Sequence, residues 1–319
     1  FVSANFTINK KDQAITLPAI GAKTYGDAAF SLNANTDSNL TLSYSSSNTS
    51  VATVTTAGVV TIKSNGEATI TASQPGNGNY NAATPVTATL SVGKKALTVS
   101  GAAVTPKVYD GTETAQITGT LSGVVVGDDV TLAVSGTFAD ANFGTNKEVT
   151  SSSTLDGAQA SRYTLTQPTG LKGTITKAVV TVTAASANKT FGESDPTLTY
   201  AANPSALIAG NSFSGSLTRE AGENAGTYAI GQGTLSVGDN YAITFEGATF
   251  TINKKGQAIT LPEIGAKTYG DAAFNLNATT DSNLTLSYSS SDEDVATVSA
   301  AGVVTIKSNG VATITASQA

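Results

Sequence analysis

The sequence contains no cysteine, methionine, tryptophan or histidine. Without cysteine no disulfide can hold the fold, so each domain must be stabilised by its own packed core. Without cysteine and histidine, the usual zinc sites and the Ser-His and Cys-His nucleophile pairs cannot be built. Without tryptophan, a sugar-binding surface would lack its strongest stacking side chain. These absences exclude the commonest zinc and nucleophilic chemistries.

Positive charge is scarce as well. Arg162 and Arg219 are the only arginines, charged residues make up 13% of the chain, and the net charge is −6. Binding of nucleic acid needs clustered positive charge against phosphate, which this composition does not supply. No apolar run approaches the roughly 20 residues of a membrane helix. We therefore expect neither a nucleic-acid partner nor insertion into a membrane.

A long internal repeat dominates what is present. Residues 6–74 return at 250–318 with a constant offset of 244, and 59 of the 69 aligned positions are identical. A constant offset without insertion or deletion is typical of an array of repeats. We interpret the chain as a window of about 1.3 periods of such an array.

The local patterns predict an all-β fold. Val, Ile and Thr fill runs of alternating apolar residues, as at Leu40, Leu42 and Tyr44, and this period of two indicates half-buried strands. Asn65-Gly66 between the runs 58–63 and 67–73 predicts a tight hairpin. No segment combines a helical apolar period with caps, so we expect no helix beyond a stray turn.

Particular motifs resemble known families of bacterial repeats. The segments SSSNTSVATV (45–54), GVVT (58–61) and GEATITA (66–72) resemble a bacterial immunoglobulin-like repeat of the Big group. Residues 107–112 (KVYDGT) and 139–145 (ADANFGT) resemble the YDG family. Residues 189–200 and 219–230 resemble the MBG family closely. We predict the last strand of a preceding MBG-type repeat at 1–9, and then four repeats: Big-like 10–93, YDG-type 94–176, MBG-type 177–253, and a second, incomplete Big-like repeat 254–319.

The resemblance implies tandem immunoglobulin-like β-sandwiches of about 80 residues each. Mixed arrays of these families are similar to the giant surface adhesins of Bacteroidota, including those of gliding motility. That similarity implies type IX secretion, an extracellular location on the bacterial cell surface, and a non-enzymatic stalk that holds an adhesive tip. The partners would be neighbouring repeats, and surface polysaccharide or cell-envelope proteins reached through other domains. The alternative is a glycan- or ligand-binding module that uses loops at the sandwich ends.

Candidate sites for chemistry are weak, and we expect no catalytic, cofactor-binding or metal-binding residue. Asp128-Asp129 and Asp292-Glu293-Asp294 are neighbours on turns, whereas a glycosidase needs carboxylates that face each other across a cleft. We interpret both groups as solvated loops. The stretches 76–81, 126–129 and 237–241 carry few of the oxygen ligands that calcium requires. We expect turns there, with a calcium site as the alternative.

A lysine precedes an aromatic residue by two positions in every repeat, as in Lys23/Tyr25 and Lys107/Tyr109, and again in Lys189/Phe191 and Lys267/Tyr269. Since residues i and i+2 of a strand share a face, the lysine stem is expected to cover the ring while its amine stays in water. The alternative is an intramolecular isopeptide bond to Asn or Asp, as in some Gram-positive adhesins.

The connections between repeats are short. In 6–17, 90–99, 173–182 and 250–261 only a few residues separate the last strand of one repeat from the first strand of the next. No Gly/Ser-rich or Pro-rich tract interrupts them. We therefore expect the repeats to join end to end as a stiff, extended rod. Strands of this length predict about 40 Å per repeat, or about 120 Å per 244-residue period.

Overall fold

The structure is a computed structural model of the 319-residue chain, and it describes residues 1–208 and 210–318. The chain divides into two compact bodies. The first comprises Phe1–Val180, Ala206–Phe213 and Val237–Ile243, and the second comprises Thr181–Ser205, Ser214–Ser236 and Thr244–Ala319. Each body is built from strands, and the helical structure in the described residues is a single 3-10 turn, η1 (Ala160–Arg162). The all-β prediction is confirmed.

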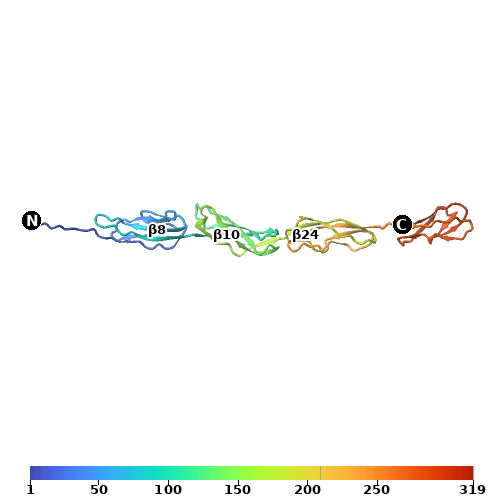
Figure 1. Ribbon diagram of the computed structural model, residues 1–319, viewed down its shortest axis with the longest axis horizontal. Helices are drawn as coiled ribbons and strands as arrows, with labels where there is room; N and C mark the ends of the chain where they lie inside the picture. Colours follow the sequence, from blue (N-terminus) through green and yellow to red (C-terminus); the bar gives the residue numbers. More distant parts are fainter. Residues whose placement is uncertain (209, 319) are drawn as a thin grey trace. The chain divides into compact units, whose positions relative to one another are not determined.

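The first repeat lies in the first body, where Figure 1 labels its strand β8. One of its sheets has the order β2-β9-β8-β5 and another the order β3-β7-β6, and β1 pairs with β4. The strands are β1 (Ile15–Thr16), β2 (Lys23–Thr24), β3 (Phe30–Ser31), β4 (Asn35–Thr36), β5 (Ser43–Ser46), β6 (Ala52–Val54), β7 (Val59–Ile62), β8 (Gly66–Ser73) and β9 (Val86–Gly93).

The two larger sheets of this repeat pack face to face. Val60 of β7 and Ile70 and Leu90 of β8 and β9 have no exposed surface and belong to one hydrophobic cluster. Strand β8 is antiparallel to β9, with Ala68 opposite Leu90 and Ile70 opposite Ala88. Alternate residues of each strand therefore point into the core between the sheets, which is the arrangement of a β-sandwich.

The second repeat follows after a single residue, because β9 ends at Gly93 and β10 begins at Lys95. Its main sheet has the order β11-β18-β15-β14-β12-β10-β17, and β13 pairs with β16. Figure 1 labels β10 within it. The strands are β10 (Lys95–Thr105), β11 (Lys107–Val108), β12 (Thr114–Ser122), β13 (Thr131–Ala133), β14 (Gly136–Phe138), β15 (Gly144–Ser151), β16 (Thr154–Asp156), β17 (Tyr163–Leu165) and β18 (Leu171–Thr176).

The fourth repeat and most of the third form the second body, whereas residues 177–180, 206–213 and 237–243 of the third repeat belong to the first. In the third, a sheet of order β20-β25-β23-β22 encloses the buried Phe250 and Ile252. The strands are β19 (Ala178–Ala184), β20 (Ala187–Thr190), β21 (Tyr200–Asn203), β22 (Thr218–Arg219), β23 (Gly226–Gly231), β24 (Tyr241–Glu246) and β25 (Ala248–Asn253). The fourth repeat has β26 (Ile259–Thr260), β27 (Phe274–Asn275), β28 (Thr279–Thr280), β29 (Ser287–Ser290), β30 (Ala296–Val298), β31 (Val303–Ile306) and β32 (Ile314–Ser317).

One local prediction is wrong. Asn65-Gly66 does not close a hairpin, because β7 pairs with β3 and β6 whereas β8 pairs with β5 and β9. The dipeptide carries the chain from one sheet to the other across the core. In the second repeat, the run 130–138 is divided between β13 and β14, which belong to different sheets. Residues 1–9 have no ladder partner among the described residues, and their assignment to the last strand of a preceding repeat stays a prediction.

Candidate functional site: the tyrosine junctions

The first body brings a tyrosine of one repeat against a tyrosine of the next. Tyr25 follows β2, and Tyr163 opens β17; they are 6% and 3% exposed. Their ring centroids lie 5.5 Å apart with an interplanar angle of 86°, an edge-to-face geometry that stabilises aromatic pairs. Both rings belong to a hydrophobic cluster that runs from Leu90 in the first repeat to Leu97 in the second. One core is therefore continuous across this junction.

Asp128 of the second repeat gathers the hydroxyls of this pair. The Tyr25 hydroxyl donates to Asp128 Oδ2 at 2.8 Å, and the Tyr163 hydroxyl donates to the same oxygen at 2.5 Å. Arg162 Nη1 donates to the Tyr25 hydroxyl at 2.8 Å and lies 3.3 Å from Asp128 Oδ1. Hydrogen bonds to a charged group are the stronger kind. The Asp128 side chain is only 10% exposed, and its charge is satisfied at the junction itself.

The same cluster fixes a loop of the second repeat. The backbone N–H of Val125 donates to the Tyr163 hydroxyl at 3.0 Å. A Cβ placed on Gly26 would lie 2.9 Å from Val125 Cγ2, and Gly26 has a φ of 87°. Glycine is needed here twice, for the left-handed backbone and for the close approach of the neighbouring repeat. We call Tyr25, Gly26, Asp128, Arg162 and Tyr163 the first tyrosine junction.

A second tyrosine junction uses the same plan between the second and third repeats, within the first body. The rings of Tyr109 and Tyr241 are 5.6 Å apart at 75°. The N–H of Ile208 donates to the Tyr241 hydroxyl at 2.9 Å, as Val125 does to Tyr163. A Cβ on Gly111, which has a φ of 75°, would lie 2.6 Å from Ile208 Cγ2. The geometry recurs although the residues are far apart in sequence.

The two junctions differ in charge. At the second, Asn211 Nδ2 donates to the Tyr109 hydroxyl at 3.1 Å, in the place where the first junction has a carboxylate and a guanidinium. Asn240 adds uncharged contacts, since its Oδ1 accepts from the Phe143 N–H at 2.8 Å and its Nδ2 donates to Asn142 Oδ1 at 3.0 Å. Each tyrosine hydroxyl is therefore matched to the neighbour it meets.

The burial of these tyrosines changes their acidity. Burial, followed by the hydrogen bond to Asp128, raises the pKa of Tyr163 to about 12. The pKa of Tyr25 is raised by the same two causes, although the nearby Arg162 opposes them. Both hydroxyls are therefore neutral donors at physiological pH, which is the state that a shared carboxylate acceptor requires.

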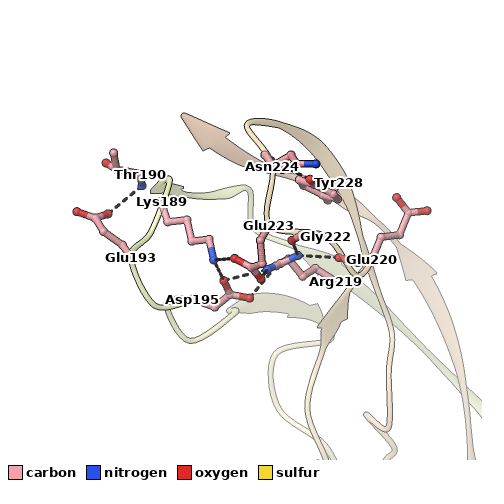
Figure 2. A network of polar contacts seen from close by, with 10 residues as sticks. All are labelled: Lys189, Thr190, Glu193, Asp195, Arg219, Glu220, Gly222, Glu223, Asn224 and Tyr228. Atoms are coloured by element: carbon pink, nitrogen blue, oxygen red, sulfur yellow. Dashed lines mark hydrogen bonds and ion pairs between the residues drawn. The ribbon is translucent and has the colours of Figure 1, made fainter. Parts of the chain in front are cut away.

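The second body contains a compact ion-pair network (Figure 2). Lys189 Nζ contacts Asp195 Oδ1 at 2.7 Å and also pairs with Glu223. Arg219 binds both carboxylates, with its Nε 2.7 Å from Asp195 Oδ2 and its Nη2 2.7 Å from Glu223 Oε1. The Arg219 guanidinium also lies 4.9 Å from the Phe250 ring centroid. Arg219 and then Lys189 lower the pKa of Asp195 to about 2, so the acid is ionised at neutral pH.

The lysine that precedes an aromatic residue by two positions makes different contacts in different repeats. The amines of Lys23 and Lys267 lie 4.4 Å from the ring centroids of Phe30 and Phe274, which are seven positions later in the chain. Lys189 is only 5% exposed and is held by two carboxylates, so the prediction of an amine in water is wrong there. The Lys189–Asp195 contact has the partners of an isopeptide bond. However, amide formation needs a neutral amine and a protonated acid, and Arg219 favours the ionised acid.

Sequence reasoning placed Asp128 on a solvated loop, and this prediction is wrong. Asp128 does lie in a turn, but it accepts hydrogen bonds from Tyr25, 103 residues earlier in the chain, and from Tyr163, 35 residues later. The three acids at 292–294 are exposed, as expected. Within the part of the chain that the structure describes, no group of three or more acidic residues could hold a metal ion. No helix of the described residues is long and apolar enough to cross a membrane.

Comparison with known families agrees with this architecture. Residues 93–170 match the YDG domain, and residues 180–251 match the MBG domain of the YGX type. Residues 38–75 and 281–319 match the immunoglobulin-like domain of intimin, in the two repeats that resemble the Big group. The chain is built of bacterial immunoglobulin-like repeats, and these families support a cell-surface adhesion or structural module with an extracellular setting. They are families of adhesion-type domains and not of enzymes.

Solved structures resemble the chain only loosely. Invasin, a bacterial integrin-binding protein, is 16% identical with a TM-score of 0.29, and the match covers 93% of this chain and 74% of invasin. Drosophila N-cadherin EC1-4 is 10% identical with a TM-score of 0.19, covering 84% and 83%. The Bacteroides ovatus protein SGBP-B, in complex with a mixed-linkage heptasaccharide, is 12% identical with a TM-score of 0.21, covering 84% and 78%. No curated protein sequence matches the chain.

Proposed function

We propose that this chain is a force-bearing stalk of a large secreted bacterial surface adhesin, and that it is not an enzyme. The observation that carries the proposal is the first tyrosine junction. A single residue separates β9 from β10, and the hydrophobic core continues from Leu90 through Tyr25 and Tyr163 to Leu97. A shared core and a short connection restrict the swing of one sandwich against its neighbour. Restricted swing is what holding a tip away from a cell surface requires.

The cellular setting of the chain is proposed from the families of its repeats. Arrays that combine YDG, MBG and immunoglobulin-like repeats resemble the gliding-motility adhesin SprB of Bacteroidota. We propose type IX secretion and attachment to the cell surface on that resemblance, with adhesion carried by other domains. The repeat boundaries 10–93, 94–176, 177–253 and 254–319 are part of this proposal, with 1–9 as the last strand of a preceding repeat. The glycan-binding alternative ranks second, because Tyr25, Tyr109, Tyr163 and Tyr241 are buried at the junctions and are not offered to a ligand.

The proposal is tested by loosening one joint. A Gly/Ser linker of about ten residues, inserted between Lys94 and Lys95, gives the second repeat a coil to swing on. We expect the mean end-to-end distance of the native chain to fall in the linker variant, as measured by small-angle scattering. The control is the same linker inserted at Gly170, in an exposed loop of the second repeat with open space around it, and it should leave the distance unchanged. If the native chain is already as bent as the linker variant, the stalk proposal fails.

A further inference from the structure

The turn around Tyr25, which forms one half of the first tyrosine junction, occurs a second time in the fourth repeat, where its tyrosine is exposed. Residues 21–30 and 265–274 are identical in sequence. In the first copy, Tyr25 is 6% exposed, whereas in the second copy the corresponding Tyr269 is 69% exposed. A Cβ on Gly26 would meet Val125 at 2.9 Å, whereas a Cβ on Gly270 meets no atom within 4 Å. Gly270 keeps the left-handed backbone, with a φ of 93°, although nothing packs against it here.

The surface is already shaped for a neighbour. Lys267 lies over the Phe274 ring at 4.4 Å, as Lys23 lies over Phe30 at 4.4 Å. The N–H of Thr268 donates to Asp271 Oδ2 at 2.9 Å, which repeats the bond from Thr24 to Asp27. Since these local contacts form in both copies, the turn does not depend on the neighbouring repeat. We call Lys267, Tyr269, Gly270 and Asp271 the open tyrosine face.

We propose that the open tyrosine face is a docking surface whose partner is a YDG-type repeat. The partner is defined by what the first copy binds: an apolar loop tip at Val125, the carboxylate of Asp128, and the Arg162-Tyr163 pair. This inference goes beyond the stalk proposal, because it concerns the choice of neighbour and not the stiffness of the array.

An MBG-type repeat is the competing occupant, and its chemistry fits less well. It presents Ile208, Asn211 and Tyr241, which suit Tyr109 of the second repeat. Against Tyr269 it would offer one amide in place of a carboxylate and a guanidinium. Hydrogen bonds to charged groups are stronger than neutral ones. The face should therefore select the YDG type.

Nitration of tyrosine by tetranitromethane is a suitable test, because the chain has no cysteine, methionine or tryptophan to compete. Peptides spanning 19–31 and 263–275 differ at both ends, so mass spectrometry separates the two copies within one molecule. In the native chain we expect Tyr269 to react about tenfold faster than Tyr25, following their exposed fractions of 69% and 6%.

Three extended chains identify the partner. The first adds a copy of residues 76–95 after Ala319, which restores a last strand but no neighbour. The second adds residues 76–176, which also supplies a YDG-type neighbour. The third adds residues 76–93 followed by 177–253, which supplies an MBG-type neighbour. We expect only the second to lower the nitration rate of Tyr269 to that of Tyr25, and Asp128→Asn in the appended repeat to reverse part of this protection.

Slower hydrogen exchange at Ile314 in all three chains would show that the added strand has docked, as β9 docks on β8. With that established, every outcome is decisive. If the first chain protects Tyr269 from nitration as well as the second chain does, the repeat covers its own tyrosine. If the third chain protects Tyr269 equally well, the open tyrosine face does not distinguish a YDG-type from an MBG-type neighbour. Either result overturns the proposal. No protection in the second chain overturns it as well. None of these results depends on whether the array is stiff.

Discussion

Removal of one hydroxyl from each tyrosine junction gives a matched pair of variants. Tyr163→Phe deprives the Val125 N–H of its acceptor and deprives the buried Asp128 of a donor. Tyr241→Phe deprives the Ile208 N–H of its acceptor in the same geometry, where no carboxylate is present. The rings and their edge-to-face packing remain in both variants. Each variant lowers the free energy of opening of its junction, and the difference between the two reductions therefore measures the hydrogen bond from Tyr163 to the Asp128 carboxylate.

The expected magnitudes follow from the hydrogen bonds. A neutral bond contributes about 1 kcal/mol and a bond to a charged group about 1.5–3 kcal/mol. Because Asp128 keeps its bonds from Tyr25 and Arg162, the lower part of that range applies. We expect Tyr163→Phe to reduce the free energy of opening at the first junction by about 2–3 kcal/mol, and Tyr241→Phe to reduce that of the second by about 1 kcal/mol.

Residue-resolved hydrogen exchange is the appropriate assay, because tandem repeats do not unfold as one two-state unit. The amides of Val125 and Ile208 report the two junctions, and that of Ile70 in the core of the first repeat serves as the control that should not change. A double-mutant cycle with Asp128→Asn would give the coupling between Tyr163 and the carboxylate directly. Equal losses at the two junctions, or a coupling near zero, would refute the role assigned to Asp128.

Four further outcomes are expected. The pKa of Tyr163 is raised to about 12 from 10.0, so its stabilisation is full below pH 10 and is lost between pH 10 and 12; alkaline unfolding should show this loss, and Tyr163→Phe should abolish it. The pKa of Asp195 is lowered from 3.8 to about 2, so the ion-pair network should persist above pH 4 and dissolve as pH falls through 2, as carboxyl NMR would report. Ile314 should exchange faster than its counterpart Ile70, which is fully buried between β5 and β9. The intact mass should equal the sequence mass, and a mass lower by one water would instead indicate an amide between Lys189 and Asp195.

The sequence was sufficient for the fold class because its evidence is local. Alternation at Leu42 and Tyr44 and the β-branched runs around Ile70 each specify a strand and its buried face within a few residues. The hairpin at Asn65-Gly66 could not be judged in that way. A positive φ is required at Gly66 (131°), but whether the chain then returns to the same sheet or crosses to the other depends on partners elsewhere.

The candidate site was hidden for a related reason. The recurrence of Tyr25 and Tyr109 after a lysine, and of Tyr163 and Tyr241 near the repeat ends, was visible as spacing. That the two series meet each other across the junctions was not, because the pairs are more than 100 residues apart. Asp128 looked like an ordinary turn acid, since its partners are distant in sequence: Tyr25 belongs to another repeat, and Arg162 and Tyr163 lie more than 30 residues later. A periodic aromatic residue at a repeat end is the signal that could have indicated a contact between neighbours.

The difference in charge between the two junctions bears on how such a gene can grow. A duplication of one repeat alone would set Tyr25 against a surface that lacks Asp128 and Arg162, or Tyr109 against one that lacks Asn211. A duplication of three consecutive repeats copies every matched pair together and leaves each tyrosine with a suitable neighbour. The unit that duplicates is then a group of three repeats whose junction residues match one another, and not a single β-sandwich. Near-identity at an offset of 244 residues, about three repeats, is the record that this mode of growth would leave.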